Sequence, residues 1–211
     1  MGNTHKVVNS ANKIFTLSKY HPVAVMTYSN AAFMGVPWDI IIKEYRKELD
    51  DKSFPMLKDY MDDFVSFLHT RNFFCDEDTQ RSHMRLLLDS FFNLCCNEIL
   101  REKRIDAKDL AEQLIVEKLQ RCLENNKAGK QCPEFEGYAY TDFELYAKAI
   151  VSEYAKSIGF DNTELLCESF YHYLSAKIYT SLSTVLVFVG YGEDEIYPSL
   201  FPIIVSFGMD E

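Results

Sequence analysis

The residue types that could do chemistry are scattered along the chain, and few stand at spacings that catalysis or metal binding requires. His69, Cys75 and His83 are separated by six and eight positions, which match no common zinc pattern. Cys167 and His172 could form a nucleophile and base pair, but five positions place them about 140° apart around a helix. We therefore interpret these residues as separate positions on helix faces, and we predict no metal and no cofactor.

The cysteines predict packing rather than redox chemistry. Cys95 and Cys96 follow the apolar stretch 91–94, whereas thiolate formation needs an electropositive and partly exposed site. The chain has six cysteines and no C-x-x-C pair, and its N-terminus carries no secretory signal pattern. These features are typical of reduced and mostly buried thiols.

The segment from Gly190 to Glu195 combines two glycines with three acidic residues. Gly190 and Gly192 are not followed by a helix with a Lys-Ser/Thr start, so they do not form a phosphate loop. Three consecutive carboxylates in a tight turn cannot all converge on one cation. We therefore expect 193–195 to be a solvated turn between two strands.

Lys13 is the one basic residue that we single out as a candidate for catalysis. It begins a short apolar stretch that has the pattern of a β-strand. A lysine at a strand edge facing solvent is the common structural explanation for such a residue. Composition and spacing alone do not decide between a catalytic lysine and a lysine that faces solvent at a strand edge.

The elements that would position these residues form three blocks. Two hairpin patterns stand near the ends of the chain, with strands expected at 12–17, 22–28, 184–189 and 199–207. Helical spacing fills the middle, with segments expected at 37–49, 55–69, 76–95, 106–123, 141–159 and 162–174. Thr141 and Glu144 have the spacing of a capping box, and Gly159 follows as a left-handed cap. This order predicts an α+β fold in which both hairpins share one sheet.

Composition narrows the class of protein. The formal net charge is −10, which argues against a nucleic-acid footprint because phosphates require clustered Lys and Arg. No apolar run reaches the ~18 to 20 residues of a membrane-spanning helix. We therefore expect a cytoplasmic protein that binds neither nucleic acid nor membrane.

The two hairpin blocks resemble the sheet segments of proteasome-type N-terminal-nucleophile (Ntn) hydrolases, the family of HslV and the proteasome β subunits. Near the start, the matching features are the turn at 2–4, Lys13-Ile14, the apolar strand at 22–28 and the small-residue turn at 29–32. Near the end, they are the strand at 185–189, the Gly-Tyr-Gly turn at 190–192 and the strand at 198–205. Together they cover under a third of the chain.

The resemblance implies a mechanism and two site residues. In the family an N-terminal threonine attacks an amide carbonyl and its own α-amine acts as the base. A lysine favours the deprotonated nucleophile, and a backbone amide in a small-residue turn stabilises the oxyanion. These roles carry over to Lys13 and to the turn at Ser29, where the family usually has glycine. Ser206-Phe207-Gly208 stands in the place of a Gly-Ser-Gly turn. The threonine would lie upstream of Met1, so we expect the chain to be inactive.

The resemblance also implies an organisation. The sheet core with its first helix is expected at 1–49 and 182–211, and a helical insertion at 50–181, together forming one compact unit. Because the first strand would have an unpaired edge, we expect a homo-oligomer or a partner protein. The alternative is a non-enzymatic module whose helical insertion binds another protein while the sheet is only a scaffold.

Overall fold

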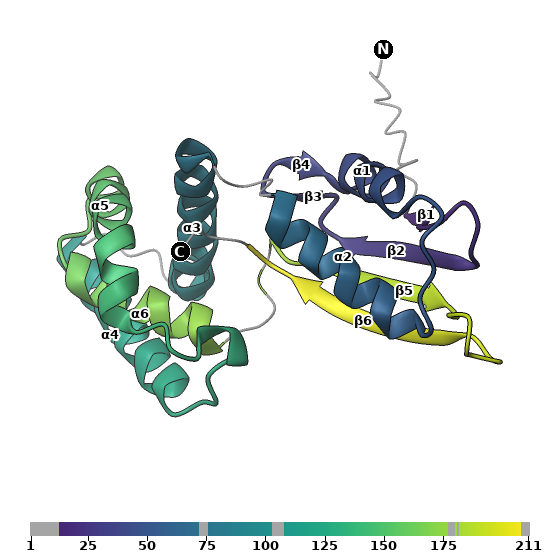
Figure 1. Cartoon of the computed structure of the whole chain (residues 1–211). Helices are drawn as coiled ribbons and strands as arrows, with labels where there is room; N and C mark the ends of the chain where they lie inside the picture. The colour runs from purple at the N-terminus through teal and green to yellow at the C-terminus, as the bar shows by residue number, and fades with distance from the viewer. Residues whose placement is uncertain (1–12, 72–75, 103–107, 177–179, 181, 208–211) are drawn as a thin grey trace, which may run out of the picture. The chain divides into compact units, whose positions relative to one another are not determined.

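The computed structural model describes residues 13–71, 76–102, 108–176, 180 and 182–207 (Figure 1). This part of the chain is an α+β protein, as the sequence predicted. The described residues fall into two compact units: the sheet unit, 13–71 with 182–207, and the helical unit, 76–176 with 180. The strands are β1 (Ile14–Thr16), β2 (Val23–Ser29), β3 (Ala32–Phe33), β4 (Val36–Pro37), β5 (Thr184–Gly190) and β6 (Ser199–Val205). The helices are α1 (Trp38–Leu49), α2 (Leu57–Arg71), α3 (Glu77–Glu102), α4 (Lys108–Lys127), α5 (Tyr140–Ile158) and α6 (Thr163–Ala176).

The sheet unit is built on a four-stranded antiparallel sheet in the order β1-β2-β5-β6 (Figure 1). Strands from opposite ends of the sequence form its central pair, β2 and β5, with Val25 opposite Phe188 and Thr27 opposite Leu186. β-branched and aromatic residues suit this pleated surface. The expectation that the two hairpins share one sheet is confirmed.

Helices α1 and α2 cover one face of this sheet. The ring of Phe188 on β5 meets Phe64 of α2 at 5.5 Å between centroids, and Phe64 meets Tyr45 of α1 at 4.9 Å. Both contacts are edge-to-face, the arrangement that aromatic quadrupoles favour. All three side chains are buried, and burial of each such ring contributes about 1.5–3 kcal/mol. The hydrophobic core of the sheet unit lies between this face and the two helices.

The opposite face of the same sheet carries apolar side chains that remain exposed. We call it the apolar sheet face. Strand register aligns its residues in three rows: Thr16, Ala24, Val189 and Leu200; Ile14, Met26, Val187 and Pro202; and Tyr28, Val185 and Ile204. Ile14 is 66% exposed and Leu200 is 60% exposed. A sheet with one solvated face normally places polar residues there, so this apolar surface is typical of a face that packs against another layer.

A small structure that the sequence analysis missed joins β2 to α1. The turn expected at 29–32 continues into a two-stranded ladder in which β3 pairs with β4. The rings of Phe33 and Trp38 stack at 5.5 Å, and the Trp38 amide donates to the carbonyl of Ala31 at 3.1 Å. These contacts fix the start of α1 against the end of β2.

The helical unit consists of α3, α4, α5 and α6 around an aromatic core. Phe91 of α3 meets Phe170 and Tyr173 of α6 at 5.6 and 4.9 Å, and Phe143 of α5 meets Phe170 at 5.8 Å. On α4, the carbonyl of Leu119 accepts a hydrogen bond from the buried Ser169 hydroxyl at 3.3 Å. The aromatic residues of the middle of the chain therefore form a core of their own.

The division between the units differs from the sequence prediction in one respect. We placed the boundary at residue 49, whereas α2 packs on the sheet and the division falls between residues 71 and 76. Two helices thus accompany the sheet, and four form the second unit. Among the described helices, none combines the length and the apolar character needed to cross a membrane.

Candidate functional site

Lys13 lies immediately before β1, at the edge of the sheet. Its carbonyl accepts a hydrogen bond from the Thr27 amide at 2.7 Å, which places Lys13 opposite Thr27 on β2. The Lys13 side chain is exposed. The lysine is therefore held by backbone pairing while its ammonium group stays available to a neighbouring group.

Ser29 ends β2 in an unusual conformation. Its φ is 79°, in the left-handed region where residues other than glycine are uncommon. Such a backbone costs on the order of 1–3 kcal/mol and persists only when the surrounding structure determines it. The turn thus has the conformation that glycine favours, although the residue is serine. Strain of this kind concentrates at functional sites.

Three side chains hold the turn that follows Ser29. The buried Thr184 hydroxyl donates to the carbonyl of Asn30 at 3.1 Å and accepts from the Trp38 indole N–H at 3.0 Å. The Asn30 side chain donates to the carbonyl of Leu182 at 3.1 Å. The turn is therefore tied to β5 by hydrogen bonds whose partners come from distant parts of the sequence. Sequence reasoning missed Thr184, whose only signal is a hydroxyl at the start of an otherwise apolar strand.

The structure brings Lys13 and the Ser29 turn to one end of the β1–β2 pair. Lys13 lies opposite Thr27, and Ser29 is two residues further along β2, so the two are diagonal neighbours on the face of the sheet that carries Val25 and Phe188, not on the apolar sheet face. Diagonal neighbours in an antiparallel pair are about 7–8 Å apart, which a lysine side chain can span. A positive charge and a strained backbone turn can therefore act on one reacting group.

Hydroxyl groups line the same end of the neighbouring strands. Ser183, just before β5, and Ser206, just after β6, are joined through their hydroxyl oxygens at 2.7 Å. Ser183 is buried. Ser206 opens the segment that the resemblance matched to a Gly-Ser-Gly turn, and Gly208 of that segment lies outside the described residues. The matched turn at 2–4 is also outside them.

The isolated candidates from the sequence remain apart. His69 lies in the sheet unit and His83 in the helical unit, while Cys75 is outside the described residues. Within the described residues no cluster of His, Cys, Asp or Glu could hold a metal ion. Burial raises the pKa of the Cys167 thiol to about 11 and lowers the pKa of His172, and neither shift involves the other residue.

Glu195 has a structural role that the prediction of a solvated turn did not include. One carboxylate oxygen accepts from the amides of Leu57, at the start of α2, and of Gly192, at 2.7 and 2.8 Å. The other accepts from the Ser199 hydroxyl at 3.0 Å. The backbone bonds from Gly192 and then Leu57 are the main causes that lower the pKa of this carboxyl group. Glu195 thus joins the β5–β6 turn to the first turn of α2.

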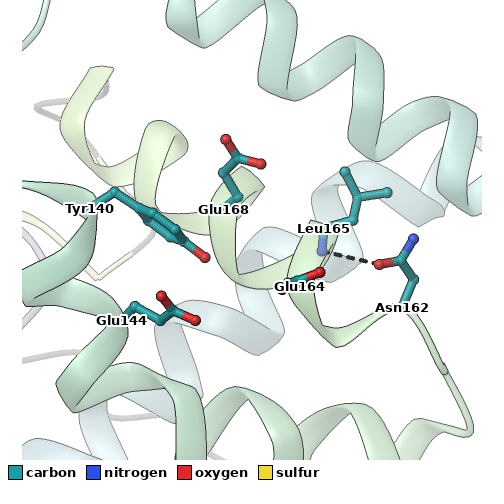
Figure 2. A pocket seen from close by; sticks show the side chains of 6 residues that line it. All are labelled: Tyr140, Glu144, Asn162, Glu164, Leu165 and Glu168. Atoms are coloured by element: carbon teal, nitrogen blue, oxygen red, sulfur yellow. Dashed lines mark hydrogen bonds between the residues drawn. The ribbon is translucent and has the colours of Figure 1, made fainter.

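A pocket of about 380 Å³ opens in the helical unit between α5 and α6, lined by Tyr140, Glu144, Asn162, Glu164, Leu165 and Glu168 (Figure 2). Two of its carboxylates already have cationic partners, because Lys148 pairs with Glu144 at 2.9 Å and Lys127 with Glu168 at 2.6 Å. Asn162 accepts from the Leu165 amide at 3.1 Å and so caps α6 (Figure 2). These contacts give Glu144, Glu168 and Asn162 structural roles.

Among the described residues, the end of the sheet that carries Lys13 and the Ser29 turn is the arrangement best suited to catalyse a reaction. Comparison of the chain with family models, with curated proteins and with solved structures finds no match.

Proposed function

We propose that the sheet unit is one half of a proteasome-type Ntn hydrolase and that it supplies the lysine and the oxyanion turn of a threonine-dependent amide hydrolase. The observation that carries this proposal is the two-sided character of the sheet. Helices α1 and α2 cover one face, and the apolar sheet face on the other side has the composition of an interior surface. Two antiparallel sheets that pack face to face, each with helices on its outer side, are the layered fold that the family resemblance implies.

The arrangement of helices also supports the proposal. The family places a pair of helices between its two hairpins, and here α1 and α2 are the two helices of the sheet unit. The other four helices form a separate compact unit, so they constitute an insertion after α2. With this insertion set aside, the strands and helices of the sheet unit stand in the order that the resemblance implies.

In the proposed mechanism, the nucleophilic threonine comes from a strand beside β1, outside the described residues, and lies at the end of the sheet next to Lys13. The ammonium group lowers the free energy of the deprotonated hydroxyl, and the α-amine of the threonine accepts its proton. Attack on an amide carbonyl then develops an oxyanion, which a backbone N–H of the turn after Ser29 stabilises. The hydrogen bonds of Thr184 and Asn30 hold that turn before substrate arrives. Without that threonine the described residues have the supporting groups only, so we expect no hydrolysis.

A covalent probe tests this function. The protein isolated from its native cells is treated with a peptide epoxyketone and examined by intact mass and peptide mapping. We expect one adduct on an N-terminal threonine and at least a tenfold slower reaction for Lys13→Ala, since one well-placed electrostatic group contributes about 10²–10³ in rate. Lys19→Ala, an exposed lysine in the β1–β2 turn, is the matched control. Absence of an adduct, or an adduct on a cysteine, would refute the proposal.

A second candidate function is a non-enzymatic module in which the helical unit binds a protein. The observation that favours it is the exposure of large apolar side chains on this unit: Leu86 and Leu94 of α3 are 57% and 62% exposed, and Leu145 of α5 is 87% exposed. Under this proposal, Leu94→Lys weakens capture of a native partner while Lys13→Ala does not. Under the hydrolase proposal, Lys13→Ala slows probe labelling at least tenfold while Leu94→Lys does not.

A further inference from the structure

The helical unit brings together two cysteines that the sequence separates by a whole helix. Cys95 lies on α3 and Cys122 on α4, and the Cys95 thiol donates a hydrogen bond to the Cys122 sulfur. Both residues are partly exposed, whereas the adjacent Cys96 is buried. Two sulfurs in hydrogen-bond contact can form a disulfide bond once they approach to its length of about 2.05 Å.

The Cys122 sulfur accepts hydrogen bonds from two neighbouring side chains. It accepts a hydrogen bond from the side-chain amide of Asn126 at 3.2 Å, in addition to the bond from Cys95. Lys118 stands one turn before Cys122 on α4, and its charge acts on Cys95, whose pKa it lowers against the larger effects of the Cys122 hydrogen bond and of burial. Hydrogen-bond donors and a cation near a partly exposed sulfur are the conditions that make a cysteine reactive.

The two cysteines have different roles in this arrangement. Cys95 gives its proton to the shared hydrogen bond, which, together with burial, raises its pKa. For Cys96, the next residue along α3, burial is the cause that raises the pKa, to about 11. Cys122 is therefore the sulfur suited to attack, Cys95 the sulfur suited to resolve, and Cys96 an internal control.

We propose that Cys95 and Cys122 form a peroxide-sensitive thiol pair that closes to a disulfide between α3 and α4. The Cys122 thiolate attacks one oxygen of hydrogen peroxide, the O–O bond breaks, and a sulfenic acid and hydroxide result. The Cys95 sulfur then attacks the sulfenic sulfur, the S–O bond breaks, and water leaves with the proton that Cys95 releases. Overall two thiols and one peroxide give one disulfide and two waters, so the sulfurs are oxidised and both peroxide oxygens are reduced. This modification site is independent of the proposed hydrolase function.

The test is thiol counting and peptide mapping of the full chain after treatment with hydrogen peroxide. We expect the number of titratable thiols in denaturant to fall from six to four and the non-reducing map to show one cross-link, between Cys95 and Cys122. Dithiothreitol restores all six. Six thiols after treatment, or a cross-link that joins other cysteines, would overturn the proposal.

Single serine variants assign the two roles. In Cys95→Ser the sulfenic acid at Cys122 has no resolving partner, so dimedone labels Cys122 at least fivefold more than in the wild-type chain. Cys122→Ser prevents both the cross-link and dimedone labelling of Cys95, while Cys96→Ser forms the cross-link as the wild type does. The assigned roles would be contradicted if dimedone labelled Cys95 in the Cys122→Ser variant as strongly as it labels Cys122 in the Cys95→Ser variant. The peptide map of the wild-type chain tests the cross-link directly, so this test does not depend on whether any variant folds.

Discussion

At the scale of single residues, two glycines in the β5–β6 region are required by close backbone contacts. A Cβ on Gly192 would lie 2.3 Å from the carbonyl oxygen of Pro55, and a Cβ on Gly190 would lie 2.0 Å from that of Pro22. Real Cβ atoms do not come so close to backbone, so any side chain here forces the chains apart. The two glycines of the Gly-Tyr-Gly turn are thus explained by the packing of Gly190 against the start of β2 and of Gly192 against the segment before α2.

Gly192→Ala is expected to destabilise the sheet unit by about 1–3 kcal/mol, the range for overpacking in a well-packed site. Gly35→Ala is the matched control in the same unit. Gly35 has φ +83° but open space around it, so only backbone strain of about 1 kcal/mol applies. Urea unfolding measures both. If Gly192→Ala and Gly35→Ala lowered the free energy of unfolding equally, the close contact with Pro55 would add nothing to the cost of a side chain at Gly192.

Glu195 makes the stability of the sheet unit depend on pH. Its folded pKa lies below the ordinary value of 4.5, so its stabilising contribution is present above that value and disappears as the pH falls through the folded pKa. Glu195→Gln should therefore lower Tm at pH 7, and the difference from the wild type should shrink toward pH 3. Glu193→Gln is the control, because Glu193 bonds Phe54 through its backbone N–H. A difference that grows as the pH falls would contradict this role.

At the scale of elements, the hydroxyl of Thr184 is the link between β5, α1 and the turn after Ser29. Thr184→Val keeps the shape of the side chain but leaves the Trp38 N–H and the Asn30 carbonyl without this partner. An unsatisfied buried polar group costs about 1–3 kcal/mol, and we expect a loss of stability in that range. The exposed Thr16→Val should change stability by less than about 0.5 kcal/mol. Chemical denaturation compares the two, and equal effects would show that the Thr184 bonds are dispensable.

The sequence predicted elements well where a strong periodicity determines them. The four strands of the larger sheet and the six helices follow from alternation and helical spacing, and Gly159 has the predicted left-handed conformation. The predicted capping box of Thr141 and Glu144 is wrong, because Asp142 accepts from the Ala139 amide and α5 begins one residue earlier. Glu144 instead pairs with Lys148. Such details depend on which of several nearby carboxylates reaches an amide, which spacing alone does not determine.

The candidate site could be predicted only in part for a related reason. Lys13 and Ser29 were identified through the family resemblance, and strand pairing places them at one end of the sheet. Thr184 and the Cys95–Cys122 contact join residues that are far apart in sequence. Local patterns identify the apolar face of a helix such as α2 but not the surface that it covers, which is why the predicted boundary at residue 49 differs from the division found in the structure.

At the scale of the whole molecule, the apolar sheet face predicts association whenever no second layer covers it. Static light scattering of the chain alone should give a mass above 24.5 kDa. Leu200→Lys, on the exposed face, should reduce that association without lowering stability by more than about 0.5 kcal/mol. Lys156→Glu, an exposed charge change on α5, is the control. A monodisperse species of 24.5 kDa for the unmodified chain would contradict this expectation.

The central claim is that this sheet is one layer of a two-layer hydrolase fold. The most direct measurement is an experimental structure of the protein isolated from its native cells. We predict a second antiparallel sheet about 10 Å from the face that carries Met26 and Ile204. We also predict an N-terminal threonine at the end of the β1–β2 pair, beside the Lys13 ammonium group. A structure in which that face lies in water, or is covered by the helices α3 to α6, would contradict the account.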